Sequence, residues 1–236
     1  MTIAPVAGDG ERLFRPADGW TRGTRRVVAV VPLAGAGVVA IAASFDPAYR
    51  VLVREDGVLE WLQAIVYGAT ALLAIVATPR LWGSGARFEA LVVAALGLLS
   101  FVSLGEELSW GQRLLAFETP DIASGNSQGE LTLHNDERFE DSARVGLLLA
   151  GLYGAVAPFV ARRPAHVVPP RVLVPWFAVV AGYFAFRLVW LEAPSYAEAK
   201  YSEWPETCLA VAVGLWTASV VAGGGRPLGR GRDAPL

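Results

Sequence analysis

Cysteine, histidine and charged side chains are all scarce in this sequence. Cys208 is the single cysteine and lies inside an apolar run, which excludes an intrachain disulfide and a site built from several thiolates. With His134 and His166 as the two histidines, a histidine-rich zinc site is excluded as well. The formal net charge is −2 and no basic patch stands out. Because nucleic-acid binding depends on clustered cationic side chains, nucleic acid is excluded as a main partner.

Common catalytic motifs are also missing, and we expect no cleavable leader. The sequence contains no Gly-x-Ser-x-Gly nucleophile elbow, no Walker loop and no dinucleotide fingerprint. Its first 25 residues are polar and rich in arginine, and they lack a short apolar core followed by a cleavage site. We therefore expect the first apolar segment to be a retained membrane anchor.

Apolar residues are abundant. The chain of 236 residues is 54% hydrophobic and 18% charged, with a mean hydropathy of +0.43, whereas soluble domains average about 25% charged residues. A membrane-spanning helix needs about 20 apolar residues, and six runs approach or reach that length: 26–45, 58–78, 88–105, 145–161, 172–191 and 204–222. The sequence thus predicts an all-α, polytopic membrane bundle at 26–222, a cytoplasmic segment at 1–25 and a disordered cytoplasmic tail at 223–236.

Basic residues indicate the orientation of the spans. Of the 20 basic residues, 13 lie before the first span, between the second and third, between the fourth and fifth, or in the tail, and 17 of the 22 acids lie elsewhere. Because cytoplasmic loops retain positive charge, we predict a multi-pass protein of the cell membrane with both termini in the cytoplasm. The long connection 106–144 then lies on the outer face.

The polar residues of greatest interest gather in the stretch from Gly105 to Asn135. A connection as long as 106–144 is uncommon unless it is functional or disordered. Within it, apolar residues at helical spacing predict that 106–117 continues the preceding helix or forms an interfacial amphipathic helix. We expect that helix to end near Thr119-Pro120, where proline stops it.

Glu106 and Glu107 stand at the C-terminal end of an outward-running span, where the helix dipole disfavours negative charge. Two explanations remain open. Either Arg113 or Arg187 pairs with one of the carboxylates, or a cation binds there. Arg187 lies inside the fifth span, and an intramembrane charge is paired or functional by default.

Glu60 and Glu206 each open a span that enters from the outer side. Helix capping and the dipole explain both without any function. They nevertheless lie at the depth of Glu106 and Glu107, so we predict one shared vestibule with carboxylates within about 10–12 Å of one another, the width of a small pocket.

Glu130 and His134 are four residues apart, a spacing that places both on one face of a helix. A hydrogen-bonded or solvated loop histidine is the simple alternative. If the pair is functional, the loop folds back so that His134 reaches Glu106, Glu107 or Arg113. A metal set of Glu107, Glu130, His134 and Glu206 would favour calcium, magnesium, manganese or iron; the cofactor is otherwise unknown.

Three segments of this stretch, EELSWGQR, FETP and QGELTLHN, together with Glu60, resemble an uncharacterised family of bacterial multi-pass membrane proteins. The resemblance implies that these residues form one site and supplies no activity. Our catalytic candidates are Glu106, Glu107, Arg113 and His134. Substrate-binding candidates are Glu60, Trp110, Gln112, Asn135 and Arg187.

Three functions are compatible with these residues, all with the lipid bilayer as partner. The first is an outer-face, cation-dependent enzyme acting on a lipid-linked or envelope substrate. The second is a non-catalytic subunit that docks a membrane-protein partner through the outer loop. The third is a small-solute or ion transporter, which ranks lower because Arg187 is the one charge deep in a span. Small residues at Gly35, Gly37, Gly151, Gly154 and Gly182 would allow close helix packing in all three cases.

Overall fold

The computed structural model describes residues 20–115, 139–161, 167–190 and 195–223, with the side chains of 113 and 114 left out. These residues form helices joined by turns, and no strand occurs among them. The longer helices are α1 (Arg22–Ala42), α3 (Val58–Gly83), α4 (Arg87–Glu107), α6 (Glu140–Val160), α7 (Val174–Trp190) and α9 (Glu203–Gly223). Short helices are α2 (Asp46–Val53), α5 (Gln112–Leu115), α8 (Tyr196–Lys200) and the 3₁₀ turns η2 (Ser109–Gly111) and η4 (Arg171–Leu173).

Six helical segments are long and apolar enough to cross a membrane, which confirms the predicted all-α polytopic bundle. The chain is a multi-pass membrane protein. Three boundaries differ from the predicted ones by four or five residues, one of them the end of α3, which lies at Gly83 rather than at 78. Helix α1 begins at Arg22, where the Thr21 side chain accepts a hydrogen bond from the Thr24 backbone N–H at 3.1 Å. Helix α6 begins at Glu140 rather than at 145, because Glu140 and Asp141 suit a helix N-terminus and both pair with Arg144.

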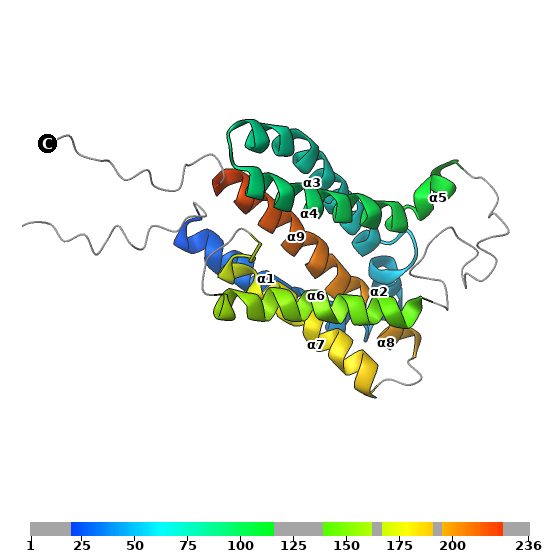
Figure 1. The fold of residues 1–236 in the computed structure, drawn as a ribbon. Coiled ribbons are helices and arrows are strands. Elements are labelled where there is room, and N and C mark those ends of the chain that lie inside the picture. Colours follow the sequence, from blue (N-terminus) through cyan, green and yellow to red (C-terminus); the bar gives the residue numbers. More distant parts are fainter. Residues whose placement is uncertain (1–19, 116–138, 162–166, 191–194, 224–236) are drawn as a thin grey trace, which may run out of the picture.

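Helix α9 runs through the middle of the bundle (Figure 1). It packs against α3 and α4 on one side and against α7 and α1 on the other, while α6 packs on α7. The described ends of the chain lie at one end of the bundle, together with the α3–α4 connection. Helices α2, α5 and α8 lie at the opposite end (Figure 1), which we call the α2/α8 end.

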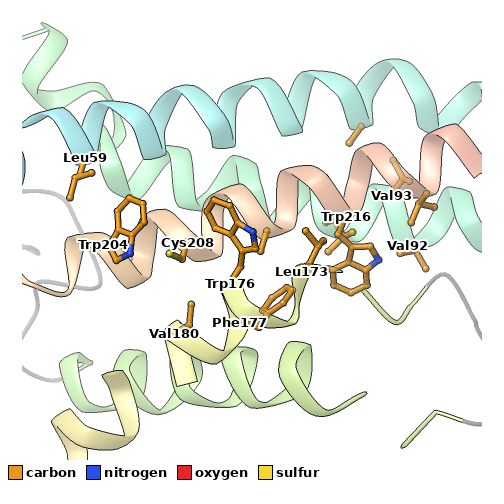
Figure 2. Close-up of a cluster of buried hydrophobic side chains, with 14 of the residues drawn as sticks. Leu59, Val92, Val93, Leu173, Trp176, Phe177, Val180, Trp204, Cys208 and Trp216 are labelled. Carbon is orange, nitrogen blue, oxygen red and sulfur yellow. The ribbon is translucent and has the colours of Figure 1, made fainter. Parts of the chain in front are cut away.

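Large side chains from α7 and α9 fill the centre (Figure 2). Trp176, Phe177 and Val180 of α7 and Cys208 of α9 are all buried. In contrast, many large apolar side chains on the outer faces are exposed, such as Ile75 at 67%. This distribution is typical of a bundle whose periphery contacts lipid.

A proline in α1 is compensated by a side chain from another helix. Pro32 has no N–H, so the carbonyl of Val28 loses its usual helical partner. The Trp176 indole donates to that carbonyl at 2.7 Å, and the Trp204 indole donates to the carbonyl of Pro32 at 3.0 Å. These bonds join α1 to α7 and α9 without leaving the freed carbonyl unpaired in an apolar interior.

Three of the five glycines that we expected at helix contacts are found there. A Cβ on Gly35 would lie 1.9 Å from the Trp204 ring, one on Gly154 would lie 2.1 Å from the Phe177 ring, and one on Gly151 would lie 2.5 Å from the Ala181 backbone. The expectation is wrong for Gly37 and Gly182, which have open space around the Cβ position and face outward.

Candidate functional site

A cavity of about 550 Å³ lies at the α2/α8 end of the bundle, a volume within the range of small-molecule sites. Seven glutamates and three basic side chains line it, together with two tyrosines and a few apolar and small residues. The charged lining residues are Glu55, Glu60, Glu106, Glu107, Glu140, Glu203, Glu206, Arg144, Arg187 and Lys200.

The predicted vestibule residues Glu60, Glu106, Glu107 and Glu206 all line this one cavity, and so does Arg187. They come from α3, α4, α9 and α7, so the bundle brings together helix ends that are far apart in the sequence. Glu60 and Glu206 stand in the first turns of α3 and α9, where the dipole favours a carboxylate. Glu106 and Glu107 stand in the last turn of α4, where it does not.

Glu60 also has the capping role considered from the sequence. Its carboxylate accepts a hydrogen bond from the Asp56 backbone N–H at 2.8 Å. Asp56 precedes α3 and has a positive φ of 56°, so the glutamate stabilises a strained turn in addition to lining the cavity. Capping and cavity lining are therefore compatible at this position.

Trp110 contacts Glu106 directly. The Trp110 indole N–H donates to the Glu106 carboxylate at 2.8 Å. Its ring covers Gly105, where a Cβ would lie 2.8 Å from ring atoms, and it meets Phe101 edge to face at 6.3 Å. This donor offsets part of the dipole penalty at the end of α4, a contribution that the sequence interpretation assigned to an arginine or to a bound cation.

The backbone after α4 turns sharply, so the expectation that α4 continues through 106–117 is wrong, while the alternative of a separate helix stays a prediction because 116 and 117 lie outside the described residues. Ser109, Trp110 and Gly111 have φ values of 47°, 51° and 85°, so three successive residues are left-handed. Such a conformation costs a non-glycine residue roughly 1–3 kcal/mol. The Trp110 contacts with Glu106 and Gly105 help to offset that cost. Helix α5 follows and contains the predicted site residue Gln112.

Glu203 is a cavity residue that sequence reasoning missed. The buried Gln63 amide donates to its carboxylate at 3.2 Å and to its backbone carbonyl at 3.1 Å. Lys200 lies 3.6 Å from the other carboxylate oxygen, and the Glu203 side chain is only 13% exposed. A signal was present, because Glu203-Trp204 opens α9 as Glu60-Trp61 opens α3.

Glu60 and Glu206 lie close enough to Glu203 to act on it electrostatically. Deeper in the cavity, Tyr67 of α3 is within hydrogen-bonding reach of Ser103 and within electrostatic range of Glu107 and Glu206. Carboxylates and a hydroxyl thus face one small volume. Such a donor set suits hard cations and amines and could also hold or move a proton.

Three predicted site residues lie outside the described residues: Glu130, His134 and Asn135. The side chain of Arg113 is likewise not described. Within the described parts of the chain, no group of three or more His, Cys, Asp or Glu residues has a geometry that could hold a metal ion. Glu107 and Glu206 of the predicted metal set share the cavity, and the set as a whole stays a prediction.

Comparison with protein families, with curated proteins and with solved structures gives no match to this chain. The resemblance to an uncharacterised membrane family therefore stays a prediction, and the site must be interpreted from its own residues.

Proposed function

We propose that the acidic cavity is the functional site of a bacterial inner-membrane protein and that it faces the extracytoplasmic side. Both termini are then cytoplasmic. The support is the asymmetry of charge: Arg22, Arg25, Arg26, Arg80 and Arg87 lie at the end that holds the termini, whereas the cavity glutamates lie at the other end. Cytoplasmic loops retain basic residues in this way.

We further propose that the site binds a cation and performs acid–base chemistry on a lipid-linked or envelope substrate. One observation carries this proposal: seven glutamates from separate elements line a single cavity with only three basic side chains. Carboxylates are costly in a bundle of membrane helices unless they have partners. Helix N-termini account for Glu60, Glu140, Glu203 and Glu206, but not for Glu106 and Glu107.

The proposed cation ligands from the helices are Glu107 and Glu206. In this proposal Glu130 and His134 complete the coordination from the outer connection, and Glu106 with Arg113 contributes to acid–base catalysis. Magnesium, calcium and manganese suit such an oxygen-rich set. Water bound to the cation would supply a nucleophile for hydrolysis or transfer.

Transport is supported less well. The buried hydroxyls of Thr70, Thr207 and Thr217 each donate to a carbonyl of their own helix, at 2.8, 2.7 and 2.9 Å. Each of these hydroxyls is thus engaged within its own helix. Among the described residues, the acids and bases of the cavity all lie toward one end.

The test is cation binding by purified protein in detergent. Elemental analysis and thermal melting with and without magnesium, calcium or manganese should show a bound ion and a raised Tm in the wild type. Glu107→Gln and His134→Ala should lose both together. Asp46→Asn is the matched control, because Asp46 is exposed, pairs with Arg50 and does not line the cavity.

Equal metal content and equal melting in wild type, Glu107→Gln and His134→Ala would contradict the cation site. That result would instead favour a subunit that docks a partner through the outer connection.

A further inference from the structure

Two of the cavity walls are helices that hardly touch each other. Helix α4 contributes Val102, Ser103 and both of its terminal glutamates, and α6 contributes residues from Glu140 to Leu147. Among the described residues, α4 packs on α3 and α9 and α6 packs on α7 and η4, with no extensive contact between α4 and α6. The cavity is thus bounded by a seam between two membrane-spanning helices.

The flanks of this seam are apolar on the outside of the bundle. Val102 lines the cavity and is 39% exposed, and Leu98, one turn further along α4, is 64% exposed. On α6, Gly146 lines the cavity, and a Cβ built there meets nothing within 4 Å. Among the described residues, open space therefore lies beside Gly146.

Further from the α2/α8 end, α6 contacts α9 instead. Tyr153 of α6 contacts Trp216 of α9, with ring centroids 6.4 Å apart. Seven residues separate Gly146 from Tyr153, or about 10 Å along a helix. The acidic cavity therefore borders the half of α6 that precedes this contact.

We propose that the cavity opens sideways between α4 and α6 into the bilayer and receives an amphiphile with a cationic headgroup. This inference rests on the proposed function, which places the cavity at the outer leaflet. In the metal-free protein the headgroup lies among Glu106, Glu107 and Glu206, where it takes the place of the inorganic cation, and the hydrocarbon chain leaves the cavity past Val102 and Gly146. A route through the seam spares the chain from crossing water.

The net negative charge of the cavity lining favours a cationic headgroup. Glutamates outnumber basic residues, and one of the three bases, Arg144, already pairs with Glu140 and Asp141 of its own helix. An anionic lipid would be repelled by this lining, whereas an amine or quaternary ammonium group would be attracted. The opening between spans favours a ligand that arrives from lipid over a soluble cation.

The test uses full-length protein in nanodiscs of phosphatidylcholine that contain a minor fraction of either dioleoyl-trimethylammonium-propane or phosphatidylglycerol. Val102 is replaced by photoreactive p-benzoylphenylalanine, and lipid adducts are identified by mass spectrometry. Leu98 carries the same group in the control, because it is exposed on α4 and does not line the cavity. All samples contain EDTA, so that failure of the metal proposal leaves this test unaffected.

We expect adducts at position 102 to be enriched several-fold in the cationic lipid over its share of the bilayer, while adducts at position 98 follow bulk composition. Gly146→Trp fills the seam from α6 and should lower the cationic-lipid adducts at 102 several-fold. Gly182→Trp, also in open space but on α7 and outside the cavity lining, should not.

Adducts at 102 that follow bulk composition, or that persist unchanged in Gly146→Trp, would overturn the proposal. Tetramethylammonium ion in the buffer distinguishes a lipid headgroup from a soluble cation of the same chemistry. The ion is added at the same total concentration as the cationic lipid. If it abolishes the adducts at position 102, the ligand is a soluble cation and the lateral route is refuted. Weak competition supports the route through the bilayer.

Discussion

Replacement of Gly154 by alanine should separate α6 from α7. The added Cβ would lie 2.1, 2.2 and 2.5 Å from three atoms of the Phe177 ring, whereas carbon atoms in contact prefer about 3.5–4.0 Å. One of the two helices must therefore retreat by roughly 1.5 Å. Phe177 is 2% exposed and lies in the packed core, so the expected loss of stability is about 1–3 kcal/mol.

Gly182→Ala is the matched control, because it lies on α7 with nothing within 4 Å of the new Cβ. Alanine at such a site gains about 0.4–1 kcal/mol, so the two variants should differ by roughly 1.5–4 kcal/mol. The measurement is reversible unfolding in mixed micelles titrated with sodium dodecyl sulfate. Equal stabilities would refute the close α6–α7 packing described here.

The same variant should alter the cavity. Helices α6 and α7 contribute Arg144, Leu147, Tyr183 and Arg187 to its walls, so displacement of one helix moves these side chains away from the carboxylates of α9. Because Arg144 and Arg187 are cationic, cation affinity should rise in Gly154→Ala and stay at the wild-type value in Gly182→Ala.

Three further predictions concern single contacts and topology. Trp176→Phe leaves the Val28 carbonyl without its indole donor and should cost about 1–3 kcal/mol; adding Pro32→Ala restores a helical N–H for that carbonyl and should recover part of the loss in a double-mutant cycle. Trp110→Phe removes the donor to Glu106 but keeps a ring over Gly105, so it should cost about 0.5–1 kcal/mol in the same unfolding assay, whereas Trp61→Phe should be neutral. Reporter fusions after Arg80 and Arg163 should report cytoplasm and a fusion within 120–128 should report the outside; a cytoplasmic signal from the last would reverse the proposed orientation.

The spans could be predicted from the sequence because each is a long apolar run whose length matches a bilayer. The central position of α9 could not, since hydropathy does not indicate which span is surrounded by the others. That position explains why Glu203 was missed: its burial depends on Gln63 and Lys200, which only the packing of α9 against α3 and the short turn before α9 bring to it.

The shared vestibule was predicted from depth alone, because acids at the same ends of spans must lie near one plane. The turn after α4 was not predicted, because a left-handed Ser109-Trp110 pair has no propensity signal beyond the glycine that follows. It depends on contacts of the Trp110 ring and indole. At Gly37 and Gly182 the sequence instead predicted a helix contact that is not found. A small residue in a span permits close packing but does not establish it.

The central claim is that the glutamates of separate helices share one cavity that opens to the extracytoplasmic side. Single cysteines at Glu60, Glu107 and Glu206, probed in intact spheroplasts with a membrane-impermeant thiol reagent, test it most directly. The native Cys208 is fully buried and should not react. The account predicts labelling from outside at all three positions. In variants with two of these cysteines, a bulky reagent attached to the first should protect the second from labelling. Labelling only after the membrane is opened, or labelling of one position without effect on the others, would contradict it.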